Sequence, residues 1–219
     1  MDSEFSPWAF RHTARGAGKP MLTFPNDTDT AVIVLHEIYG VNRHILDACA
    51  RYQAEGYSVF CPEMLGAGVV FPYERRDDAY AYFMNTVGFG SASVIERLVA
   101  DMRRLHRRLY LIGYSVGATL AWLAAGGAAC DGIVCHYGSR IRDYPAAMPS
   151  CPALLVLAED DAAFPPARAR DLFGEAPNIV LGVFAGDHGF CDEYGSAYRP
   201  ASAEKARMLV QDFLHGGKT

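Results

Sequence analysis

The sequence contains no uninterrupted apolar run that approaches the roughly 20 residues needed for a membrane-spanning helix. Its first segment, MDSEFSPWAF, carries acidic side chains early and lacks the apolar stretch of a secretory signal. The six cysteines include no Cys-x-x-Cys pair, and most lie within apolar segments, which favours buried free thiols over a metal site or disulfides. We therefore expect a cytoplasmic protein with reduced thiols.

A strong charge of either sign is also absent. The formal net charge is −5 over 219 residues, which gives no reason to expect a nucleic acid or an anionic membrane as a partner. The sequence has no internal repeat, no low-complexity tract and no shift in composition that would mark a second domain. A chain of this length can bury one substantial core, so we expect a single domain over 1–219, with 1–20 as an N-terminal arm.

Short apolar runs alternate with longer amphipathic segments along the chain. This pattern is typical of a mainly parallel α/β sheet with helices on both faces. The run 31–35 (AVIVL) is apolar throughout, as expected for a strand that is covered on both sides. The predicted strands are 21–24, 31–35, 57–61, 109–112, 132–135, 153–157 and 179–184.

Helices are predicted between these strands. Asn42 offers an N-cap for a helix that ends at Gly56, and the capping box Ser93-x-x-Glu96 is expected to begin a second helix. Three further helices are expected at 115–125, 165–173 and 202–214. The stretch 62–107 is longer than a crossover needs and is rich in aromatic residues, which either line a binding crevice or cover the sheet.

The segment 113–117 (GYSVG) follows an apolar strand and precedes a predicted helix. A strand that turns sharply into a helix holds its apex residue in a strained conformation, and glycines two positions away on either side remove side chains that would clash. Ser115 at the apex would project its hydroxyl above the sheet, at the positive end of the helix. The Val116 amide would then point to where a tetrahedral oxyanion forms. The context favours a nucleophilic serine over a merely capping one.

An acid and a histidine follow this serine in the order that such a nucleophile requires. Asp161 lies on the loop after a predicted strand, with Asp160 as the competing acid. His188 lies between two glycines after the last predicted strand, whereas His136 precedes the acid loop and would break the order. An imidazole must accept the serine proton and a carboxylate must orient the imidazole, so Ser115, Asp161 and His188 are the predicted catalytic residues.

With these residues placed, the sequence resembles the dienelactone hydrolase family of α/β-hydrolases from about Thr30 to the C-terminus. The segment 36–42 (HEIYGVN) is similar to the family's segment after an early strand, and 61–64 (CPEM) resembles the end of its next strand. The serine turn, the acid loop and the histidine loop match those of the family in order and spacing. The resemblance implies an α/β-hydrolase that cleaves a small ester or lactone through an acyl-enzyme. We expect no cofactor and no metal ion.

The resemblance also implies that Glu37 belongs to the site and that the Ile38 amide is a second oxyanion donor beside Val116. From the residues alone, Glu37 could equally be a solvated loop acid. Further candidates for binding or orienting the substrate are Tyr39, Tyr114 and Tyr137.

The sequence departs from the type members of the family at two places. They carry cysteine as the nucleophile, with the glutamate helping to control the thiolate, whereas Ser115 stands here. They also bind a substrate carboxylate with two arginines, one of them just after the catalytic histidine. Here Cys191 and Asp192 follow the histidine loop, and no arginine appears after His188 until Arg199. Arg75 and Arg76 are candidates for the second carboxylate-binding arginine. The sequence therefore leaves the acyl specificity open.

Two alternatives to an esterase remain from the sequence. One is a non-catalytic protein that binds a small molecule on the same scaffold. The other is a thioesterase or a peptidase of the same fold.

Overall fold

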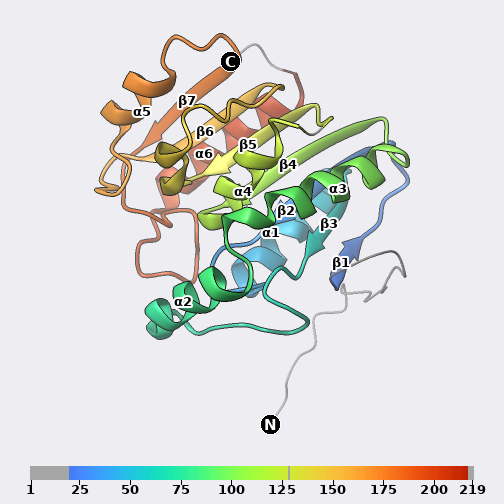
Figure 1. Cartoon of the computed structure of the whole chain (residues 1–219), viewed down its shortest axis with the longest axis horizontal. Coiled ribbons are helices and arrows are strands. Elements are labelled where there is room, and N and C mark those ends of the chain that lie inside the picture. Colours follow the sequence, from blue (N-terminus) through green and yellow to red (C-terminus); the bar gives the residue numbers. More distant parts are fainter. Residues whose placement is uncertain (1–19, 128, 217–219) are drawn as a thin grey trace.

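The computed structural model describes residues 20–127 and 129–216, and its centre is a seven-stranded sheet (Figure 1). The spatial order of the strands is β1-β3-β2-β4-β5-β6-β7. The pairing of β1 with β3 is antiparallel and the other pairs are parallel. The strands are β1 Met21–Phe24, β2 Thr30–Leu35, β3 Ser58–Pro62, β4 Arg108–Tyr114, β5 Gly132–His136, β6 Ala153–Ala158 and β7 Ile179–Phe184. All seven predicted strands are confirmed. The predicted N-terminal arm lies, except for its last residue, outside the described residues.

Helices cover both faces of the sheet, with α3 and α4 in front and α1 and α6 behind in Figure 1. The α-helices are α1 Arg43–Ala54, α2 Arg76–Thr86, α3 Ala92–Arg103, α4 Val116–Ala124, α5 Pro166–Phe173 and α6 Pro200–Leu214. Three 3₁₀ helices join them: η1 Tyr73–Arg75, η2 Phe89–Ser91 and η3 Ser139–Asp143. The helices expected at 115–125, 165–173 and 202–214 correspond to α4, α5 and α6, with ends that differ by one or two residues.

Strand β2 shows why an uninterrupted apolar run is needed at the centre of the sheet. Ala31, Ile33 and Leu35 belong to a first buried cluster, beneath α3, α4 and α5. Val32 and Val34 belong to a second buried cluster, beneath α1 and α6. Because side chains alternate along a strand and both faces are covered, no position of 31–35 is exposed to solvent.

The two predicted helix starts have different outcomes. Asn42 caps α1 as expected, since its side chain accepts a hydrogen bond from the Ile45 amide at 3.1 Å. The capping box at Ser93 and Glu96 is wrong, because α3 begins one residue before Ser93, at Ala92. The 3₁₀ turn η2 leads directly into α3, so Ser93 lies inside the first helical turn and cannot act as its N-cap.

Helix α2 was not predicted from the sequence, where it forms part of the aromatic-rich stretch 62–107. It buries only two side chains, Ala79 and Phe83, and the rest of its surface is largely exposed. Figure 1 shows α2 set apart from the sheet. A helix that buries so narrow a stripe leaves little periodic signal in its sequence.

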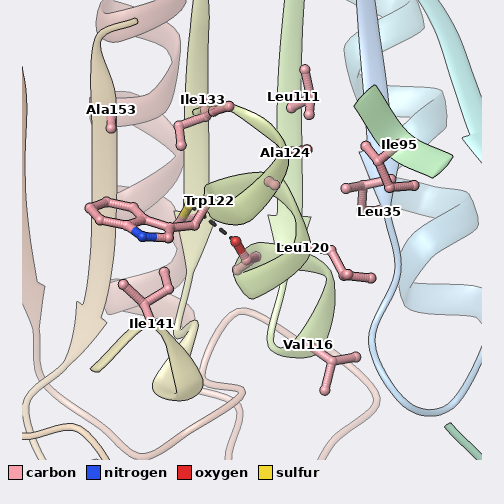
Figure 2. Close-up of a cluster of buried hydrophobic side chains, with 14 of the residues drawn as sticks. Leu35, Ile95, Leu111, Val116, Leu120, Trp122, Ala124, Ile133, Ile141 and Ala153 are labelled. Carbon is pink, nitrogen blue, oxygen red and sulfur yellow. Dashed lines mark hydrogen bonds between the residues drawn. The ribbon is translucent and has the colours of Figure 1, made fainter. Parts of the chain in front are cut away.

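The first buried cluster holds α4 against the sheet (Figure 2). Trp122 of α4 is fully buried and is directed toward Ile133, Ile141 and Ala153. Its indole Nε1 donates a hydrogen bond to the Tyr144 carbonyl at 3.3 Å. Because α4 is buried almost along its whole length, its packing fixes the position of the turn that precedes it.

We expect Trp122→Ala to lower the free energy of unfolding by about 3–5 kcal/mol, because the change leaves a large cavity beneath α4. Leu105→Ala is the control: Leu105 is 70% exposed, and its loss should cost less than about 0.5 kcal/mol. Urea unfolding of the three proteins measures both values. Equal losses in the two variants would contradict this account of the core.

Candidate active site

Ser115 lies at the apex between β4 and α4, in a backbone conformation that non-glycine residues rarely adopt. Its φ is 52° and its ψ is −111°, and its amide donates to the His136 carbonyl at 2.9 Å. A Cβ atom on Gly113 would lie 2.3 Å from the Gly117 carbonyl oxygen, and one on Gly117 would lie 2.2 Å from the Leu35 carbonyl oxygen. Only glycine fits at these two positions, which is the strained strand-to-helix turn expected from the sequence.

The three predicted catalytic side chains come together at this turn. Ser115 Oγ lies 2.9 Å from His188 Nε2, and His188 Nδ1 lies 2.9 Å from Asp161 Oδ2. A proton on Nδ1 would be donated to Asp161 and would leave Nε2 free to accept from the serine hydroxyl. Asp160, the competing acid, is exposed and lines the adjoining cavity instead.

The environment of Asp161 favours its carboxylate form. Burial raises its pKa, but hydrogen bonds from His188 and Ser139, together with the charge of His188, outweigh burial and hold the pKa at about 2. The Ala163 amide adds a third donor, to Oδ1 at 2.9 Å. A carboxylate held in this way remains charged over the physiological pH range.

Ser139, the first residue of η3, was not predicted from the sequence to belong to the site. Its Oγ donates to Asp161 Oδ2 at 2.8 Å and lies 3.1 Å from His188 Nδ1. Its side chain therefore braces the contact between the acid and the histidine. A signal was available, because Ser139 follows the strand that ends at His136 and so lies at the same edge of the sheet as Ser115.

His136, the competing base, belongs to the other side of the sheet. It is buried and stacks on Tyr114 with ring centroids 4.5 Å apart. Burial, followed by the charges of His44 and Arg51, lowers its pKa to about 3. A general base that acts near neutral pH needs a pKa close to 7, so the pKa of His136 is too low for this role.

The three candidate tyrosines have different places. Tyr39 lines the cavity above Ser115. Tyr137 is buried, with its ring 5.1 Å from that of His188, so it packs behind the imidazole. Tyr114 belongs to the second buried cluster and is not brought to the cavity, because side chains alternate along β4 and its ring faces α1.

A cavity of about 870 Å³ opens beside Ser115. Its lining includes Ile38 and Val116, the residues whose amides were predicted to receive an oxyanion. The volume is ample for a small-molecule substrate. Among the residues that the structure describes, no group of three or more histidine, cysteine, aspartate or glutamate side chains is arranged to hold a metal ion.

Glu37 also lines this cavity, although only 4% of it is exposed. Its Oε1 has no hydrogen-bond partner. Burial, followed by the charge of Asp192, raises the pKa of Glu37 to about 8. At neutral pH its side chain is therefore mainly a neutral carboxylic acid that can donate a hydrogen bond.

Residues 20–216 match the model of the dienelactone hydrolase family. The chain belongs to this family. Dienelactone hydrolase-like proteins are hydrolases, and the resemblance seen in the sequence is confirmed.

Individual relatives span most of the chain. An uncharacterized protein, YczH, of Bacillus subtilis is 34% identical over 83% of this chain and 90% of its own length. Carboxymethylenebutenolidase of Pseudomonas putida is 26% identical, with 84% of each chain covered.

Solved structures show the same α/β-hydrolase fold. A putative dienelactone hydrolase from Klebsiella pneumoniae has a TM-score of 0.70 and 23% identity, and the match covers 88% of this chain and 92% of that one. A dienelactone hydrolase from Anabaena variabilis has a TM-score of 0.66 and 16% identity, with 94% and 97% covered.

Within this dienelactone hydrolase family member, one of the expected arginines, Arg76, lines the cavity and the other two, Arg75 and Arg199, do not. Arg76 lines the cavity, together with Arg140 and Arg142 of η3, which were not singled out in the sequence. Arg75 pairs with Asp78 at 2.9 Å, and neither Arg75 nor Arg199 belongs to the lining. Arg140 and Arg142 follow Ser139 within the same 3₁₀ turn, which presents all three side chains to the cavity.

We expect the stability of the protein to depend on the ionisation of Glu37. Because its pKa in the folded protein is raised above the ordinary 4.5, the folded state holds the proton more tightly than the unfolded state. This contribution to stability is fully present below about pH 4.5 and is lost as the pH rises through about 8, by on the order of 5 kcal/mol. Four other titratable groups near Glu37 stay protonated over this range because their pKa values are raised: Tyr39, Tyr73, Tyr137 and Cys191.

Glu37→Gln cannot titrate, so its free energy of unfolding should rise relative to wild type between about pH 5 and pH 8. Denaturant unfolding of both proteins at several pH values measures this difference. The comparison cancels the opposite contributions of His44 and His136, whose pKa values are lowered. A difference that does not change with pH would show that Glu37 titrates normally.

Proposed function

We propose that the protein is a serine hydrolase that cleaves a carboxylic ester or lactone. Ser115 is the nucleophile, His188 the general base and Asp161 the acid that orients the imidazole. The observation that carries the proposal is the 2.9 Å contact between Ser115 Oγ and His188 Nε2, at the apex of a strained strand-to-helix turn. Carboxymethylenebutenolidases among the relatives support an ester or lactone as the class of substrate.

The reaction would proceed through an acyl-enzyme. Ser115 Oγ attacks the carbonyl carbon while His188 Nε2 takes the hydroxyl proton, and the oxyanion faces the amides of Val116 and Ile38. Collapse of the tetrahedral adduct breaks the bond to the alkoxy oxygen, which receives the proton from His188. A water molecule, activated by His188, then attacks the acyl-enzyme and releases the acid and Ser115.

Glu37 would take a different part from the thiolate-controlling glutamate of the family. A neutral carboxylic acid beside the nucleophile can donate a hydrogen bond to an oxygen of the substrate. Asp192 is the acid whose charge acts on Glu37. It accepts hydrogen bonds from Tyr73 Oη at 2.7 Å and from the Tyr194 amide at 2.9 Å. Burial and then the charge of Asp192 raise the pKa of Glu37, and both favour the protonated form of Glu37.

A cytoplasmic location is part of the same proposal. All six cysteines are free thiols in the structure, and five of them are buried, which suits a reducing compartment. Among the described residues, no helix is both long enough and apolar enough to cross a bilayer.

We expect a fluorophosphonate probe to label the wild-type protein and to fail to label Ser115→Ala, because the probe reacts with a serine activated by an imidazole. Ester hydrolysis should fall in the same variant by a factor of about 10⁴ or more. Mass spectrometry of the intact protein measures labelling. Ser150→Ala is the control, since Ser150 lies away from the cavity and bonds to the Ala125 carbonyl. Equal labelling of wild type and Ser115→Ala would remove Ser115 from the mechanism.

Ser139→Ala should lower kcat about tenfold, because Asp161 and His188 lose the hydroxyl that braces their contact. Ser139→Thr keeps a hydroxyl at this position and should recover most of the loss. Steady-state kinetics on one ester, with folding checked by circular dichroism, measures both variants. Unchanged kcat in Ser139→Ala would show that the backbone alone holds Asp161 in place.

A further inference from the structure

One part of the cavity lining combines carboxyl groups with aromatic rings. We call it the acidic wall, and its members are Glu37, Tyr39, Tyr73, Asp77 and Asp192. Tyr39 and Tyr73 pack edge to face, with ring centroids 4.8 Å apart. Asp192 is 3% exposed and accepts a hydrogen bond from Tyr73. Two of its acids, Glu37 and Asp192, are therefore built into the fold, whereas Asp77 lies on the exposed side of α2.

The negative charge of the acidic wall has no buried counter-charge. Asp192 lies 3.8 Å from His44 Nδ1, but burial lowers the pKa of His44 to about 4 in spite of this carboxylate, so the ring is neutral at neutral pH. Among the described residues, no arginine or lysine forms an ion pair with Glu37 or Asp192. Glu37 lines this space, and its Oε1 is buried and has no hydrogen-bond partner. An unpartnered buried carboxyl group is an opening for a ligand that can bond to it.

The arginines of the cavity do not cancel this charge. Arg140 and Arg142 both lie beside Asp143, at 2.8 Å and 3.7 Å, so their positive charge is shared with a carboxylate outside the lining. Arg76 is exposed to solvent on α2. The described lining holds six carboxyl groups against three guanidinium groups.

Such a surface recognises some substrates and rejects others. In a partly desolvated cavity, a carboxylate close to Asp192 is repelled strongly, whereas a positive group is attracted. Tyrosine rings bind ammonium groups through their faces. A neutral carboxylic acid such as Glu37 donates a hydrogen bond to a neutral oxygen of the substrate.

We propose that the acidic wall receives a neutral or positively charged part of the ester and discriminates against a carboxylate. This inference rests on the proposed function and names its substrate class. It also fits the sequence after His188, which holds Asp192 and has no arginine before Arg199.

Three nitrophenyl esters test this inference on the wild-type enzyme. They share one straight acyl chain and differ only at its far end, which carries a trimethylammonium group, the isosteric tert-butyl group or a carboxylate. We expect kcat/KM for the ammonium and tert-butyl esters to exceed that for the carboxylate ester by about tenfold or more. Added salt should narrow the difference between the ammonium and carboxylate esters.

The outcomes separate this inference from the proposed function. If kcat/KM for the carboxylate ester is less than tenfold below that for the tert-butyl ester, or above it, the inference is wrong, while the proposed esterase activity still stands. No hydrolysis of any of the three would overturn the proposed function, and the inference with it.

Single substitutions test which residues discriminate against the carboxylate ester. Asp192→Asn should reduce the tert-butyl to carboxylate ratio of kcat/KM severalfold, because it removes the buried negative charge. Asp171→Asn makes the same change at an exposed position on α5 and should leave the ratio as it is. Because Asp192 is buried, Asp77→Asn on the exposed side of α2 serves as a second variant with the same expected direction. An unaltered ratio in folded Asp192→Asn and in Asp77→Asn would show that the wall does not select the charge of the substrate.

Discussion

The backbone of Ser115, held at a φ of 52°, is the constraint on which the site depends. A non-glycine residue in this region costs on the order of 1–3 kcal/mol and persists only where its surroundings impose it. Here they do, because Gly113 and Gly117 allow β4, α4 and the end of β2 to approach closely, and because α4 is buried along most of its length. The stability of the core is thus what holds the serine hydroxyl beside His188.

Two carboxyl groups near Ser115 have opposite environments, and this difference organises the chemistry that we propose. Asp161 is surrounded by donors from His188, Ser139 and the Ala163 amide, which hold its pKa at about 2. Glu37 lies buried beside another acid, Asp192, and its pKa rises to about 8. One group is a permanent anion that supports a positive imidazole, and the other is a neutral donor. The sequence predicts Asp161 as the catalytic acid, but it does not predict that Glu37 is protonated.

Much of the fold could be predicted because its signals are local. Central strands must be apolar on both faces, and the serine turn needs its glycines whatever the rest of the chain does. Features that depend on contacts between distant segments could not be read in this way. Ser139 follows β5 and so lies at the expected edge of the sheet, but its contact with Asp161 depends on β5 and β6 being neighbours. The sequence favoured Asp161 and left Asp160 as a competitor, because it does not show which of the two side chains the short turn directs at His188. Helix α2 buries too narrow a face to mark its own limits.

The central claim is that one imidazole and two backbone amides act on a group bound to Ser115 Oγ. A crystal structure of the protein after reaction with an alkyl phosphonate tests it most directly, because the tetrahedral phosphorus mimics the adduct formed during ester cleavage. The account predicts phosphorus bound to Ser115 Oγ, a phosphonyl oxygen within hydrogen-bond distance of the Val116 and Ile38 amides, and His188 Nε2 beside the serine oxygen. Phosphorus on another side chain, or an oxygen that points away from both amides, would contradict it.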